Sequence, residues 1–184
     1  GDSPLVTHAW SNKAREMMKD KQAGKAKKGR EVRNPHRDYC DSLYWLTPRP
    51  SEEPTAEEIA SAKFGFPVVA FKAAAVDACS QLDKAITKVQ MRGAFHINGE
   101  FAEIIGKPKM REDMVRVGMG TSDLRYRAEF AEWKVVLPLW VNVESMSVEQ
   151  VVNMFNLAGF ACGVGEYRPQ KDGSWGMFHV ESCA

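Results

Sequence analysis

Residues 159–180 bring together glycines, cations and aromatic rings, three kinds of residue that serve nucleic-acid binding. The five glycines of this segment let the backbone come close to another molecule, because they carry no Cβ. Arg168 and Lys171 add positive charge, and Tyr167 and Trp175 add flat faces on which bases can stack. The segment therefore predicts a surface that grips a nucleic-acid strand. The alternative is a glycine-rich hairpin at a sheet edge, since short motifs also match by chance.

A second candidate is the basic segment between residues 13 and 37. It holds ten Lys or Arg against three Asp or Glu, which is +7, whereas the whole chain carries +1 and the remainder therefore −6. A basic segment on a mildly acidic body predicts an arm that contacts phosphates. A solvated loop without a partner is the alternative. The contacts of such an arm are expected from Lys25, Lys27, Lys28, Arg30 and Arg33.

Two of the four histidines are candidates for acid–base chemistry. A histidine titrates near neutral pH, so it can activate the 2′-hydroxyl of RNA for cleavage without a metal. His8 follows a predicted strand, and His36 lies in the basic segment. His96 and His179 alternate with apolar strand residues, which favours structural roles. A nuclease would also need an acid and a phosphate stabiliser, and the sequence places neither.

The composition is that of an ordinary globular protein, with 44% hydrophobic and 27% charged residues, and 184 residues predict a single domain. No apolar run is long enough to span a bilayer, and four scattered cysteines suit a reducing cytosol, so we expect a cytoplasmic protein. The cysteines lack the C-x-x-C spacing of zinc sites, and no P-loop or dinucleotide fingerprint is present. We therefore expect neither a metal nor a cofactor.

The elements that must position these residues alternate between strand and helix. The second and fourth of the predicted helices open with capping boxes, at Thr55 and Ser147, and Gly159 is the expected C-cap glycine. The predicted helices span residues 11–23, 55–63, 72–82 and 148–158. The predicted strands span residues 66–71, 92–97, 132–143, 160–165 and 175–181, with a partly buried ribbon over 110–117.

This order predicts an α+β fold of the ferredoxin-like or RRM-like type. Such a fold is a βαββαβ unit with an antiparallel sheet and both helices on one face. Residues 1–184 would form one domain, in which residues 13–54 are a basic, loop-rich insertion.

Three local patterns in the chain resemble the RAMP superfamily, the RRM-derived backbone and processing subunits of CRISPR effector complexes. They are the start of the chain, residues 1–6, the segment 66–78 and the glycine loop. Pro67 and Lys72 match best in the middle segment, which otherwise lacks the family's glycine and serines. The loop matches at Gly163, Gly165, Arg168, Gly173 and Gly176. The chain also resembles a group of phage and prophage proteins, through residues 8–11, 92–96, 110–118 and 163–178.

The resemblance implies a sequence-tolerant, non-catalytic binder of single-stranded RNA or DNA that assembles along the strand, in a bacterial host cell if the protein is phage-encoded. It implies that the glycine loop and the helix with Lys72 flank the strand path, and that the hairpin over residues 107–127 acts as a thumb. Salt bridges to Glu112, Asp113, Asp123 and Glu129 are the alternative role for the hairpin arginines. The cations expected on phosphates are Lys109, Arg111, Arg116, Arg125 and Arg127.

Two other functions stay open. Some members of the family cleave RNA with a histidine and without a metal, which keeps His8 and His36 as candidate catalytic residues. A structural subunit or a mimic of a CRISPR subunit would bind protein instead, through an apolar patch. Trp10, Tyr44 and Trp45 either form such a patch or fill the core.

Overall fold

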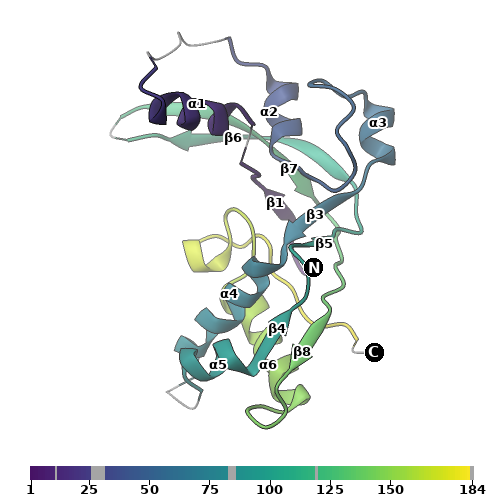
Figure 1. Ribbon diagram of the computed structural model, residues 1–184, viewed down its shortest axis with the longest axis vertical. Helices are drawn as coiled ribbons and strands as arrows, with labels where there is room; N and C mark the ends of the chain where they lie inside the picture. The colour runs from purple at the N-terminus through teal and green to yellow at the C-terminus, as the bar shows by residue number, and fades with distance from the viewer. Residues whose placement is uncertain (11, 26–31, 83–85, 119, 183–184) are drawn as a thin grey trace. The chain divides into compact units, whose positions relative to one another are not determined.

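The computed structural model describes all of the chain except residues 11, 26–31, 83–85, 119 and 183–184 (Figure 1). The protein is of the mixed α+β class, as predicted. Its chain forms two compact units. The first unit comprises Gly1–Val6, Gly65–Lys107 and Phe130–Ala184, and the second comprises Thr7–Phe64 and Pro108–Glu129. Residues 13–54, the predicted insertion, lie in the second unit together with a later segment of the chain.

The first unit is built around helices α4 and α6, which pack against each other. Strands β4 (Phe95–Ile97) and β8 (Leu139–Val141) pair antiparallel, and β5 (Phe101–Glu103) pairs antiparallel with residues 65–67 of β3 (Phe64–Pro67). The helical elements are α4 (Val68–Ala78), the 3₁₀ turn η1 (Cys79–Gln81), α5 (Lys88–Ala94), α6 (Val148–Ala161) and the 3₁₀ turn η2 (Pro169–Lys171).

An aromatic core fills the first unit. Phe71 of α4 lies with its ring centroid 5.4 Å from that of Phe178 and 6.4 Å from that of Trp133. The Trp133 indole N–H donates to the carbonyl of Ser3 at 2.8 Å, so the start of the chain is tied to the same core. Buried aromatic side chains contribute the largest apolar areas, and they therefore position the segments that carry them.

The second unit holds an exposed helix, two short helices and a long hairpin. The hairpin consists of β6 (Pro108–Arg116) and β7 (Ser122–Phe130), which confirms the hairpin predicted over residues 107–127. The other elements are β1 (Leu5–Thr7), which the division between the units crosses, α1 (Asn12–Gln22), α2 (Pro35–Asp41), β2 (Tyr44–Trp45) and α3 (Ala56–Ser61).

The capping boxes begin the helices that the sequence assigns to them. The Ser147 hydroxyl accepts the N–H of Gln150 at 3.2 Å, and the Gln150 side chain accepts the N–H of Ser147 at 2.9 Å. Thr55 and Glu58 make the same exchange at the start of α3. A third box, at Thr87 and Gln90, begins α5. The sequence predicts a strand from residue 92, but the helix that this box begins runs to Ala94, and the strand begins only at Phe95.

Two other strand predictions are too long. Helix α4 begins at Val68, directly after Pro67, so the strand predicted to residue 71 ends four residues earlier. Of the strand predicted over residues 132–143, only Leu139–Val141 is regular, because Pro138 has no N–H to offer a ladder. Lys134 instead forms an isolated antiparallel bridge with Ile105.

The described strands fall into three small groups, with strand orders β1-β7-β6, β2-β3-β5 and β4-β8. The specific ferredoxin-like order, with one sheet under both helices, is therefore not confirmed, although the α+β class is. Residues 160–165 and 175–181 were expected to complete that sheet. Neither segment forms a regular strand, and α6 runs to Ala161.

The end of α6 differs from the prediction for a reason of packing. Gly159 lies inside the helix, and a Cβ placed there would sit 1.7 Å from the carbonyl oxygen of Phe178. The residue that ends the helix is Gly163, whose φ of +62° is left-handed and whose N–H donates to the Ala158 carbonyl at 2.9 Å. Glycine is thus required at 159 for close approach and at 163 for backbone conformation.

We predict that Gly159→Ala destabilises the protein by about 3 kcal/mol or more, because the added methyl group overlaps backbone that cannot move aside as a side chain would. Chemical denaturation followed by circular dichroism measures the change. Gly93→Ala in α5 is the matched control, since a Cβ there meets nothing within 4 Å and alanine favours a helix by about 1 kcal/mol over glycine. Equal stability of wild type and Gly159→Ala would contradict the packing argument.

Candidate nucleic-acid interface

The glycines of the C-terminal loop are approached closely by the first unit's own backbone. A Cβ on Gly165 would lie 2.6 Å from the Val6 carbonyl oxygen, and a Cβ on Gly176 would lie 1.7 Å from that of Val164. Backbone hydrogen bonds follow the same course, from the N–H of Gly176 to the Pro4 carbonyl at 2.8 Å and from that of Glu166 to the Val6 carbonyl at 3.0 Å. The close approach expected from the glycines is therefore present, and internal packing accounts for it.

The polar side chains of this loop form hydrogen bonds that hold it in place. The Arg168 guanidinium donates to the Gly165 carbonyl at 3.0 Å and to the Gln170 side chain at 3.2 Å. Gln170 in turn donates to Asp77 of α4 at 2.7 Å. Tyr167 takes a left-handed φ of 54°, and its carbonyl accepts the N–H of Trp175 at 3.1 Å. Lys171 is exposed, so it is the cation of this loop best placed to meet an anion.

Arginines of the hairpin form ion pairs on one of its faces. Arg111 of β6 lies 2.7 Å from both Asp113 and Glu129, and the buried Arg127 of β7 lies 3.7 Å from Asp113. Arg125 pairs with Asp123 at 3.2 Å. Three of the expected phosphate contacts thus have carboxylate partners, which is the alternative that the sequence left open.

The opposite face of the hairpin carries apolar side chains into solvent. Met110 is 53% exposed, Met114 is 75% exposed and Leu124 is 42% exposed. Side chains alternate between the faces of a strand, so the methionines point away from the ion pairs of Arg111 and Asp113. Lys109 and Arg116 lie near the two ends of β6, and both are exposed.

The basic segment contributes helix α1, whose bounds agree with the helix predicted over residues 11–23. Met17 and Met18 of α1 are 65% and 50% exposed. Trp10, just before the helix, is 56% exposed, and the Arg15 guanidinium lies 5.9 Å from the centre of its ring. This pairing of a cation with an exposed indole was missed. The signal in the sequence was an amphipathic pattern whose apolar side includes a tryptophan next to several cations.

Of the expected arm contacts, Lys25 pairs with Asp20 at 2.8 Å. Arg33 pairs with Asp123 at 2.6 Å and with Asp38 at 2.9 Å, and the hydrogen bond to Asp123 raises the pKa of the guanidinium. Lys27, Lys28 and Arg30 lie outside the described residues.

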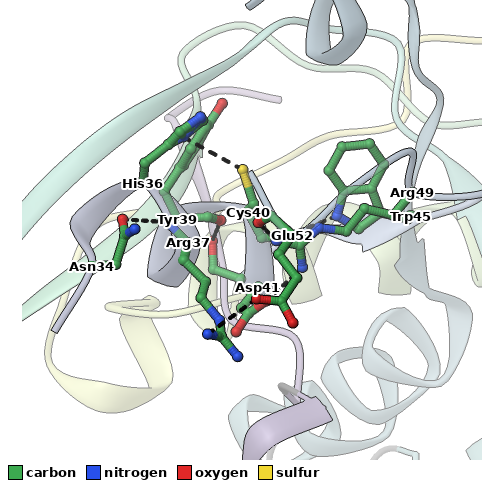
Figure 2. Close-up of polar contacts among 10 residues, drawn as sticks. Asn34, His36, Arg37, Tyr39, Cys40, Asp41, Trp45, Arg49 and Glu52 are labelled. Atoms are coloured by element: carbon green, nitrogen blue, oxygen red, sulfur yellow. Dashed lines mark hydrogen bonds and ion pairs between the residues drawn. The ribbon is translucent and has the colours of Figure 1, made fainter. Parts of the chain in front are cut away.

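His36 lies in a network of polar contacts on α2 (Figure 2). Its Nε2 is 2.9 Å from the Pro54 carbonyl, which can only accept, so Nε2 carries the proton. Its Nδ1 then accepts from the Cys40 thiol, 3.8 Å away. Both ring nitrogens have partners within the protein, and the other candidate, His8, lies exposed ahead of α1.

The same network fixes the loop that follows α2. Arg49 pairs with Asp41 and lies 5.9 Å from the centre of the Trp45 ring, and the Trp45 indole donates to the Cys40 carbonyl at 2.9 Å. Figure 2 shows these side chains gathered around the C-terminal end of α2. Trp45 also lies edge-on to Phe64, with ring centroids 4.9 Å apart, so it serves the packing of the second unit.

Lys72 lies in the first unit, on α4. Its ammonium is 3.1 Å from Nδ1 of His96 and 5.5 Å from the centre of the Phe95 ring. The sequence singled out Lys72 but gave His96 a structural role, so the structure brings together two residues that the sequence treated separately.

Comparison with known proteins adds no relative. No protein-family model, no curated protein and no solved structure matches the chain. The resemblance to the RAMP superfamily therefore stays a prediction. Among the described residues, no helix is long and apolar enough to cross a membrane, and no group of three His, Cys, Asp or Glu side chains is arranged to hold a metal ion.

We predict that the buried thiols are unreactive in the folded protein. Burial raises the pKa of Cys40 to about 11 and also raises the pKa values of Cys79 and Cys162, so the nucleophilic thiolate is scarce at pH 8. A Cys183→Ser variant should react slowly with Ellman's reagent until guanidinium unfolds it, when all its thiols react at once.

The sign of the pH dependence follows from the same shift. The folded state binds the Cys40 proton more tightly than the unfolded state does. The contribution of this proton to the free energy of unfolding is therefore fully present below the ordinary pKa of 9.0 and is lost as the pH rises toward 11. Rapid labelling of the folded variant at pH 8 would contradict the burial of these thiols.

Proposed function

We propose that this protein binds single-stranded nucleic acid, RNA or DNA, without sequence preference and without cleaving it. The observation that carries the proposal is the open face of the β6–β7 hairpin, where Met110 and Met114 stand in solvent on the same side of β6 as Arg116, with Lys109 exposed near the other end of the strand. Flexible apolar side chains between cations suit a strand whose bases are unpaired, since the bases can lie against the apolar groups while the phosphates meet the cations.

The distribution of charge also favours the second unit as the part of the protein that binds nucleic acid. The second unit contains 17 Lys or Arg and 13 Asp or Glu in the sequence, a net charge of +4, whereas the first contains 8 and 11, a net charge of −3. A polyanion is attracted to the more basic surface. The exposed helix α1 belongs to this unit as well, and it adds Arg15, Lys19 and Lys21.

A RAMP-like origin is part of the proposal. In the first unit α4, β4, β8 and α6 occur in the order helix, strand, strand, helix, with α5 inserted before β4 and β5 after it, and β4 pairs antiparallel with β8. That order supports a ferredoxin-like arrangement within the first unit. Copies of such a protein would bind side by side along a strand.

We predict that Lys109→Ala combined with Arg116→Ala weakens binding and lowers its salt dependence. Each lost phosphate contact reduces the slope of log K against log salt by about 0.7 for a single strand. Fluorescence anisotropy with labelled 20-mers of RNA and DNA, titrated at several salt concentrations, measures both quantities. Arg92→Ala, at an exposed position in the last turn of α5, is the control for loss of positive charge elsewhere.

A companion variant separates stacking from charge. Met110→Ser combined with Met114→Ser should weaken binding at every salt concentration and leave the slope unchanged, because it removes no charge. Absence of binding by the wild type at low salt would overturn the proposed function. Binding that neither double variant affects would move the contact away from the hairpin.

A further inference from the structure

The first unit has exposed rings of its own, on the short ribbon formed by β4 and β8. His96 of β4 lies directly opposite Trp140 of β8. The N–H of Asn142 donates to the Ala94 carbonyl at 2.7 Å, and that of Asn98 donates to the Pro138 carbonyl at 2.9 Å. Hydrogen-bonded pairs alternate along an antiparallel ladder, so His96 and Trp140 form such a pair with their Cα atoms about 5.5 Å apart.

The two rings belong to the face of the ribbon that is turned away from the core. Phe95, the neighbour of His96, is fully buried, and its ring centroid lies 5.2 Å from that of Phe155 on α6. Because successive side chains point to opposite faces, His96 and Trp140 both stand on the outer face. Trp140 is 66% exposed, although the backbone pairing with β4 fixes its position. A large apolar side chain is thus held in contact with solvent.

Lys72 supplies a cation at the same place. Its ammonium donates to Nδ1 of His96 at 3.1 Å. A neutral imidazole that accepts at Nδ1 carries its proton on Nε2, so Nε2 can donate to an outside group. The ribbon thus presents a flat ring and an N–H donor, and Lys72 of α4 adds an ammonium beside His96.

We propose that this Lys72–His96–Trp140 cluster binds one nucleotide of a single strand, as a contact additional to the hairpin. The base stacks on the Trp140 indole, and the phosphate accepts hydrogen bonds from the His96 Nε2–H and the Lys72 ammonium. Every base has a flat face, so the contact is tolerant of sequence. This inference extends the proposed function, because its ligand is a unit of the same strand.

The test uses the full chain and compares Trp140→Ala with Trp140→Phe. Stacking on an aromatic ring is worth on the order of tenfold in affinity, so Trp140→Ala should bind a labelled single-stranded 20-mer about tenfold more weakly, whereas Trp140→Phe, which keeps a ring, should lose much less. Lys72→Met should weaken binding and also reduce its salt dependence, since it keeps the length of the side chain but not its charge.

A second measurement separates this site from the hairpin. AMP at millimolar concentration should quench tryptophan fluorescence in the wild type and in the Lys109→Ala/Arg116→Ala variant, and the quenching should disappear in Trp140→Phe. Quenching by AMP without binding of the 20-mer would support the nucleotide site and overturn the proposed function. Wild-type affinity of Trp140→Ala for the 20-mer would overturn this inference alone, and absence of both signals would overturn both.

Discussion

A cluster of three aromatic rings determines the course of the chain in the first unit. Phe71, Trp133 and Phe178 meet there, although they come from distant parts of the sequence. Burial of such rings is the main stabilising contribution, and the segments that carry them must converge on one place. The glycine-rich loop makes this convergence possible, because it brings the chain back to Phe178 through turns and close backbone contacts. Its glycines are therefore a requirement of packing, whatever the loop binds.

The two faces of the β6–β7 hairpin illustrate how charge is distributed for two purposes. Carboxylates at Asp113 and Glu129 neutralise arginines on one face, and this pairing holds the two strands together. Removing one partner of such a buried pair costs more than the pair contributes, so those arginines are poor candidates for an outside ligand. The cations that remain available stand on the opposite face or near the ends of the strand. The count of basic residues in a segment is therefore a weak guide to its binding capacity.

Local signals in the sequence predicted most of the helices, whereas the hairpin was expected from the family resemblance. Capping boxes at Thr55 and Ser147 depend only on neighbouring residues, so they located α3 and α6 correctly. The prediction of strands on both sides of the glycine loop was wrong, because the loop backbone hydrogen-bonds to Pro4 and Val6, which lie far away in the sequence. Of the candidate site, the residue types were predictable, but the pairing of Arg111 with Glu129 or of Lys72 with His96 depends on tertiary contacts. Trp140 falls within the strand predicted over residues 132–143, but that prediction did not indicate that its side chain is exposed.

The second unit is complete once residue 129 has been synthesised, because it consists of Thr7–Phe64 and Pro108–Glu129. At that moment the first unit still lacks Trp133, α6 and Phe178. During synthesis, all residues of the second unit are therefore made before the side chains that pack against Phe71 of α4. Apolar surface exposed during synthesis favours aggregation, so the interval in which residues 130–178 are added is the one in which Phe71 and α4 lack the aromatic partners that bury them.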